Sequence, residues 1–214
     1  DTIISNLEDF RVDTSGDFDE NIFVSIENFK PYRNQLIEFF QLTSMSKDFQ
    51  VYFDQIFEFI EKFLVFYFPP ENMQSYHDEW FDNYKFMLRE IFVYLNAILL
   101  KNKRYKELNL FISEKYYIDN QYGTGTYDYG IIDNYLRSLD VIRNHRLKTQ
   151  KLSLTANILR NRADSKIISF DNFMEMDFIL TLKSIIRPDK QYVSWFPRSI
   201  IFNLGWRAKP FEIF

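Results

Sequence analysis

The amino-acid sequence predicts an all-α fold, either an irregular helical bundle or a short helical array of about seven to eight helices. Apolar residues recur every three to four positions over most of the chain, which is the spacing of helices with a buried face. The 214 residues include only 5 Gly and 6 Pro, too few for the many tight turns of a β-sandwich or barrel. Aromatic residues make up 19% of the chain, with 24 Phe and 14 Tyr, which predicts an aromatic-rich core.

The strongest helical pattern lies between residues 49 and 67. Its apolar positions follow the spacing i, i+4, i+7, i+8 of one helix face. Phe59 and Phe66 widen this stripe, which predicts a helix that is buried on more than one side. Pro69 and Pro70 end the helix, because a residue that precedes a proline avoids the helical conformation.

Further helices are predicted on both sides of this one. Pro31 suits the first turn of a helix that runs to about Leu42 and carries Phe39 on its apolar face. After the capping-box sequence Ser75-Tyr76-His77-Asp78, a second long apolar stripe extends over residues 81–99. Shorter helices are expected over residues 20–29, 104–113, 131–147, 153–163 and 171–185. Ser153 and Asp171 cap the last two of these helices, and Pro188 ends the final one.

The expected domain organisation is an N-terminal arm over residues 1–19 and one helical domain over residues 20–214. An acidic helical part (20–118) and a basic helical part (131–214) flank a loop at 119–130, which holds three of the five glycines.

The fold of residues 190–214 stays open between a helix and a short hairpin around Gly205, which would place a small strand pair near the C-terminus. The sequence starts without Met and ends on the apolar Phe214, so we expect it to be a piece of a longer protein.

Charge is unevenly distributed along the chain. Residues 1–140 carry 13 Lys and Arg against 24 Asp and Glu, whereas residues 141–214 carry 13 against 6. A basic surface is typical of proteins that bind nucleic acid or acidic partners. The alternative that we favour is ion pairing of the basic part with the acidic part or with another segment of a longer chain. The candidate contacts to a polyanion or a partner are Arg143, Arg146, Arg160 and Arg162.

The sequence carries no catalytic, metal-binding or cofactor-binding signature. It has no Cys, and its histidines, His77 and His145, lack the paired spacing of an HExxH zinc site. It contains no G-x-S-x-G nucleophile elbow. Gly123-Thr124-Gly125 and Gly130 come near the pattern G-x-G-x-x-G without matching it, and no convincing strand precedes them. We therefore expect a protein without enzyme activity, metal or cofactor.

Arg143-Asn144 resembles the opening of the signature of the helical HEPN ribonucleases. In that signature an Arg steadies phosphate, and a His five to seven positions later transfers a proton. Positions 148–150 hold Lys, Thr and Gln, and His145 comes too early. If the protein binds nucleic acid and is also an enzyme, we expect it to be a degenerate ribonuclease domain of the HEPN type. We interpret Arg143 and Asn144 as structural residues that pair with Asp140 or cap the end of a helix.

Five short segments follow one another along the second half of the chain: Arg143–Leu147, Ser153–Ala163, Asp177–Leu180, Trp195–Arg198 and Phe211–Phe214. With them, residues 90–214 resemble helical regions in the C-terminal parts of large multidomain bacterial proteins, which join an effector or NTPase to a sensing module. Many such proteins act in phage defence. The resemblance implies no cofactor and assigns no role to a single residue.

The function we expect is that of a non-enzymatic helical protein-interaction or sensing domain of a larger bacterial protein, in the setting of phage defence. Its partner would be another protein or other domains of the same chain; nucleic-acid binding is the alternative. We expect a cytoplasmic location without membrane contact. Residues 1–13 lack the apolar core of a signal peptide, and no apolar run approaches the ~20 residues of a membrane span.

Overall fold

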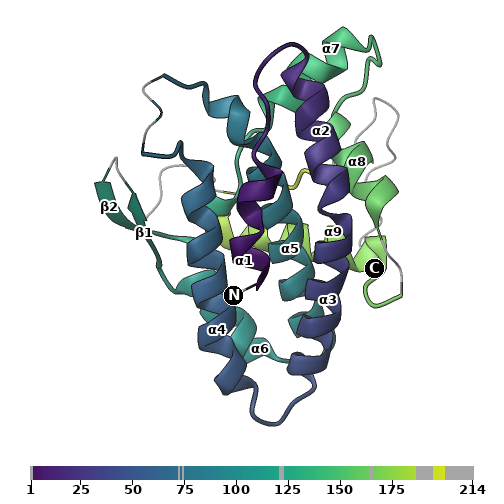
Figure 1. The fold of residues 1–214 in the computed structure, drawn as a ribbon. Coiled ribbons are helices and arrows are strands. Elements are labelled where there is room, and N and C mark those ends of the chain that lie inside the picture. The colour runs from purple at the N-terminus through teal and green to yellow at the C-terminus, as the bar shows by residue number, and fades with distance from the viewer. Residues whose placement is uncertain are drawn as a thin grey trace.

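A computed structural model describes residues 2–71, 73, 75–120, 123–163, 166–186 and 195–200, and it confirms the mostly helical fold (Figure 1). The helices pack around the central α5, and a two-stranded hairpin projects from one side. The helices are α1 (Thr2–Ser5), α2 (Phe18–Asn28), α3 (Lys30–Ser44), α4 (Phe49–Leu64), α5 (Asp82–Lys101), α6 (Tyr105–Ser113), α7 (Asn144–Arg146), α8 (Leu154–Arg162) and α9 (Phe170–Ile185).

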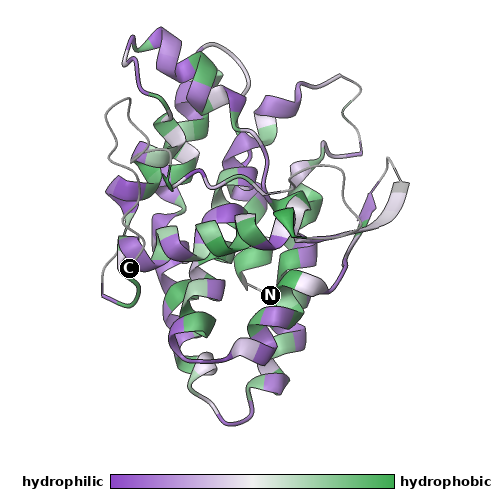
Figure 2. Cartoon of the chain, turned by 180° about the vertical axis from the view of Figure 1, so that it is seen from behind, coloured by the Kyte–Doolittle hydropathy of each residue, from purple (hydrophilic) through white to green (hydrophobic). Residues whose placement is uncertain are grey.

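The centre of the bundle is α5, in which every residue from Asp82 to Leu99 is buried. A helix that is buried on all sides must be surrounded by other elements, and α5 packs against α2, α3, α4, α6 and α9. Figure 2 shows hydrophobic residues gathered on the inner sides of the helices and hydrophilic residues on the outer sides. The hydrophobic core therefore lies along α5.

Aromatic side chains fill much of this core, as the composition predicts. The rings of Phe57 and Tyr116 stack with centroids 4.6 Å apart and planes 9° apart. Phe53 and Phe111 are also 4.6 Å apart, and Phe92 lies 5.8 Å from Trp195. Such ring pairs contribute about 0.5–1.5 kcal/mol each beyond the area they bury.

The predicted helices around α4 are confirmed. Pro31 lies in the first turn of α3, where its missing N–H costs no hydrogen bond. α4 is covered on more than one side, because it contacts α1, α3, α5 and the strand β1 (Tyr116–Asn120). Residues 2–10 pack on the same body: Leu7 is buried, and its carbonyl accepts a hydrogen bond of 2.9 Å from the Tyr84 hydroxyl.

The predicted loop at 119–130 is wrong for most of its length, because a β-hairpin occupies residues 116–127. β1 pairs antiparallel with β2 (Gly123–Tyr127), from Tyr116 opposite Tyr127 to Asn120 opposite Gly123. Burial alternates along β1, with Tyr116 and Ile118 inside and the residues between them exposed, which is the period of a half-buried strand. A strand pair thus exists in the middle of the sequence, and the strand pair expected around Gly205 lies outside the described residues.

The single helix predicted over 131–147 is wrong in its first part, while residues 137–146 are helical as predicted, with π-helical geometry over most of that run. A 3₁₀ turn (Tyr129–Ile132), a non-helical stretch, a π-helical turn (Ser138–Arg143) and α7 follow one another there. The non-helical stretch contains Asp133, whose buried carboxylate forms ion pairs with Arg89 and Arg198. These ion pairs tie the stretch to α5 and to residues 195–200. The π-helical turn begins where the Asp82 carboxylate accepts the Ser138 N–H, 2.9 Å away.

Helix starts agree with the sequence only in part. Ser153 caps α8 as predicted, since its hydroxyl accepts the Ala156 N–H at 3.1 Å. The capping box at Ser75 does not form; a 3₁₀ turn (Asp78–Phe81) leads into α5 instead. Ser169, and not Asp171, caps α9. A further 3₁₀ turn extends α4 (Val65–Tyr67), and another follows α1 (Leu7–Phe10).

None of the helices within the described ranges combines the length and apolar character that a membrane span requires. Of the segment 190–214, whose fold the sequence leaves open, only residues 195–200 are described, and they run without helix or strand into a turn at 198–199. Pro188 and Gly205 lie outside the described residues.

Candidate functional site

Two of the four candidate arginines face the first turn of α2. Arg146 lies 2.8 Å from a carboxylate oxygen of Asp19 and 2.9 Å from one of Glu20. Arg143 also pairs with Glu20, and its guanidinium lies 4.1 Å from the centre of the Phe23 ring. The hydrogen bond from Arg143, more than any other contact, lowers the pKa of Glu20. The positive charge of both arginines is therefore matched by carboxylates of the acidic part.

The other two candidates, on α8, point in opposite directions. Arg162 is buried, with a side chain 2% exposed, and it pairs with Glu90 and Glu27 at 3.0 and 2.9 Å. Arg160 lies on the exposed side of the same helix. The four arginines therefore do not share one surface. Nucleic-acid binding stays a prediction, and these ion pairs reduce the free positive charge on which it depends.

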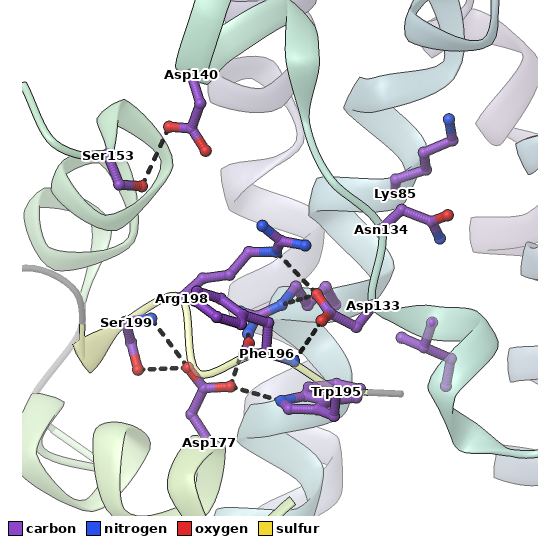
Figure 3. A network of polar contacts seen from close by, with 12 residues as sticks. Lys85, Asp133, Asn134, Asp140, Ser153, Asp177, Trp195, Phe196, Arg198 and Ser199 are labelled. Carbon is purple, nitrogen blue, oxygen red and sulfur yellow. Dashed lines mark hydrogen bonds and ion pairs between the residues drawn. The ribbon is translucent and has the colours of Figure 1, made fainter. Parts of the chain in front are cut away.

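The neighbourhood of His145 differs from the expected one. Arg143 pairs with Glu20 and not with Asp140, whose carboxylate accepts the Thr155 N–H at 2.8 Å and the Ser153 hydroxyl at 3.1 Å (Figure 3). Asp140 thereby strengthens the cap of α8. His145 itself is exposed on α7.

A second polar cluster joins α5, α9 and residues 195–200 (Figure 3). One Asp177 oxygen accepts from Arg89 at 2.6 Å and from the Trp195 indole N–H at 2.8 Å. The other accepts the N–H and the hydroxyl of Ser199, at 2.9 and 2.6 Å. The guanidinium of Arg89 also lies 5.1 Å from the centre of the Trp195 ring.

Asp133 completes this cluster. One of its oxygens accepts from Arg89 at 3.1 Å and from Arg198 at 2.8 Å, and the other accepts the Phe196 N–H at 2.6 Å. Every carboxylate oxygen of Asp133 and Asp177 is thus occupied by a donor of the chain itself. The cluster joins residues 195–200 to α5 and α9. Its ion pairs and hydrogen bonds compensate the cost of burying the charges of Arg89, Asp133 and Asp177.

Two more ionic groups lie along α5. Glu90 receives Arg33 and Arg162, and although burial alone would raise its pKa, the two arginines keep the pKa of Glu90 below its ordinary value. At the start of α5, burial raises the pKa of Asp82 to about 6, against the opposing charge of Lys85. Within the described ranges, no group of three or more His, Asp or Glu side chains is placed to hold a metal ion.

An apolar groove opens on the surface between α1, α3 and α4. Its volume is about 380 Å³, and we call it the apolar groove. The buried Leu36, Phe40 and Ile56 form its floor, and Phe39, 39% exposed, stands in its wall. No charged side chain lines it; the full lining is Ile3, Ile4, Gln35, Leu36, Phe39, Phe40, Gln55, Ile56 and Phe59.

The short helix α1 occupies one part of this seam. It contacts α4, and both of its isoleucines, Ile3 and Ile4, line the groove. In Figure 1, α1 lies in front of the bundle between α3 and α4. Beyond it, Phe39 contacts Tyr52 across the seam with ring centroids 6.1 Å apart, and Leu42, one turn further along α3, is 71% exposed.

Sequence periodicity does not predict this groove. It places Phe39 and Phe59 on buried helix faces, because apolar spacing does not separate a core position from the wall of a surface groove. The feature of the sequence that could have indicated the groove is the width of the apolar faces of α3 and α4, which is greater than the area that one neighbouring helix covers.

Comparisons of this chain with known proteins found no matching family model, no matching curated protein and no matching solved structure.

Proposed function

We propose that this protein is a non-enzymatic helical interaction domain and that the apolar groove binds an amphipathic helix of a protein partner. The observation that carries the proposal is the groove itself, whose lining is apolar apart from two glutamines and contains no charged residue, with the half-exposed Phe39 in its wall. A surface groove with an apolar lining is the kind of site that binds an apolar helix face.

The position of α1 supports the proposal that the apolar groove binds a helix. α1 shows that the α3–α4 seam accepts a helix whose isoleucines point into it. Amphipathic helices bind such grooves by anchoring apolar residues at i, i+3 or i+4 and i+7. The two polar lining residues, Gln35 and Gln55, offer hydrogen bonds without fixing a charge in the partner.

The buried carboxylates on and around α5 support the non-enzymatic part of the proposal. Glu90, Asp133 and Asp177 are each engaged by arginines of the chain and serve to join its segments. In this proposal the domain belongs to a larger cytoplasmic bacterial protein, in keeping with the resemblance of residues 90–214 to regions of phage-defence proteins.

The test is a binding titration with a designed helical peptide. The peptide is about five turns long, with Leu on one face and Gln on the other, and it carries a fluorophore for anisotropy. We expect saturable binding to the wild-type protein. The variant Phe39→Glu places a charge in the groove wall and should abolish the binding.

The matched control is Leu152→Glu, which adds the same charge at another exposed apolar position, 61% exposed, ahead of α8. It should bind the peptide as the wild type does. Absence of saturable binding to the wild type, or equal binding by Phe39→Glu, refutes the proposal.

A further inference from the structure

The N-terminal helix α1 fills part of the seam in which the apolar groove opens. Its two isoleucines, Ile3 and Ile4, are partly buried against the core and line the groove together with side chains of α3 and α4. Within the described residues, no hydrogen bond joins Ile3 or Ile4 to α3 or α4, so both isoleucines hold α1 in the seam by apolar contact. A single helical turn is unstable alone in water, because its nucleation is unfavourable. The helical shape of α1 therefore depends on its position in the seam.

The chain that follows α1 is attached to the core by contacts of its own. Leu7 is fully buried, and its carbonyl accepts the Tyr84 hydroxyl at 2.9 Å. The Phe10 carbonyl accepts the side-chain amide of Asn83 at 2.8 Å. Both donors lie on α5, so these hydrogen bonds hold residues 7–10 in place without any contribution from α1. A rotation of the backbone between α1 and Leu7 thus lets α1 leave the seam while the hydrophobic core keeps its contacts.

A partner helix that follows the seam needs the space that α1 fills. A helix of five turns is about 27 Å long, whereas α3, with 15 residues, is about 22 Å long. α1 lies between α3 and α4 (Figure 1), and its isoleucines line the groove that the partner would enter. The partner and α1 therefore cannot occupy the full length of the seam together.

We propose that α1 is an internal competitor of the partner helix, so that the apolar groove binds its partner only after α1 has left the seam. This inference rests on the proposed function, since it describes the regulation of the same groove. α1 covers part of the apolar surface while no partner is bound, and it lowers the affinity for the partner. A segment that occupies a groove for about nine-tenths of the time raises the apparent dissociation constant about tenfold.

The experiment repeats the anisotropy titration of the five-turn Leu/Gln peptide with Ile3→Ser/Ile4→Ser, which removes the apolar contacts of α1. We expect this variant to bind the peptide about tenfold more tightly than the wild type does. Unchanged binding overturns the inference. Weaker binding also overturns it, because the two isoleucines would then belong to the wall that holds the partner.

The matched control is Ile185→Ser/Ile186→Ser, which changes another pair of adjacent isoleucines. These side chains are 55% and 73% exposed at the end of α9, and neither lines the apolar groove. The control should bind the peptide as the wild type does. A tenfold gain in the control as well would show a general effect of lower surface hydrophobicity and would overturn the inference.

A spin label reports on α1 directly. The chain has no Cys, so Ser5→Cys carries a nitroxide at a single, exposed position of α1. We expect restricted motion of the nitroxide in the otherwise wild-type chain and fast motion after the peptide is added. This comparison uses the wild-type groove, so it does not depend on the folding of the isoleucine variants. A nitroxide that stays restricted in the presence of saturating peptide overturns the inference.

The outcomes separate this inference from the proposed function. If the peptide binds the wild type in a Phe39-dependent manner while the nitroxide stays restricted, the proposed function holds and the inference falls. If the peptide binds neither the wild type nor Ile3→Ser/Ile4→Ser saturably, both fall.

Discussion

The variant Glu90→Gln tests how the buried ionic groups hold the helices together. Glu90 is the shared partner of Arg33 and Arg162, at 2.9 and 3.0 Å, and its side chain is 1% exposed. Glutamine keeps the volume and removes the charge. Arg162 then still has Glu27, but Arg33, whose side chain is fully buried, retains only hydrogen bonds to the Arg162 carbonyl and to Asn34.

Removal of one partner of a buried ion pair costs about 3–5 kcal/mol, because the remaining charge stays in the interior without compensation. A domain of this kind has a total free energy of unfolding of about 5–15 kcal/mol. We therefore expect Glu90→Gln to remove a large share of the stability and to lower the denaturation midpoint markedly.

The measurement is urea denaturation followed by circular dichroism, with the slope m compared between variants. The control Glu58→Gln breaks the exposed pair with Lys62, 61% and 46% exposed, and should leave the midpoint within error. A third variant, Arg33→Met/Glu90→Leu/Arg162→Met, replaces all three charges by apolar groups and should recover most of the loss. A loss below about 1 kcal/mol for Glu90→Gln would contradict the reasoning.

Three further predictions follow from the same structure. Burial raises the pKa of Asp82 to about 6 from 3.8, so the stability that this group contributes is present below pH 3.8 and lost as the pH rises through 6. In Asp82→Asn the decrease in unfolding free energy between pH 4 and pH 7 should be smaller than in the wild type by about 2 kcal/mol, and an unchanged pH profile would refute this assignment. Asp177→Asn withdraws acceptors from Trp195 and Ser199 and a charge from Arg89, and thermal unfolding should show a loss of about 2–4 kcal/mol. Ser153→Ala removes the cap of α8 and should cost about 1 kcal/mol in urea denaturation; a neutral result would show that Asp140 alone satisfies this helix end.

The parts of the fold that local patterns determine were predictable. α3, α4, α5 and α6 lie close to their expected positions because long runs of Phe, Leu and Ile repeat with the helical period. The hairpin was not predicted, since its strands are short and β2 consists largely of Gly and Thr.

The buried charges could not be predicted from periodicity. On α5, Arg89 and Glu90 look like residues of a solvated helix face, yet both are 1% exposed. Their partners come from segments far away in the sequence, such as Asp177, 88 residues after Arg89. The imbalance between the acidic and basic parts did indicate attraction between them, and Arg143, Arg146 and Arg162 form such contacts. It did not indicate which arginines would be buried.

The position of α5 has a consequence for synthesis on the ribosome. Tyr84 binds the carbonyl of Leu7, 77 residues earlier, whereas Arg89 binds the carbonyl of Phe196, 107 residues later. The nascent chain can therefore close its first contacts early, but Arg89 gains its second carboxylate partner, Asp177, and its bond to the Phe196 carbonyl only after these late residues have left the exit tunnel. A chain cut at the charge boundary near residue 140 would leave Arg89 without Asp177 and Glu90 without Arg162, so we expect the acidic part alone to be much less stable than the whole chain.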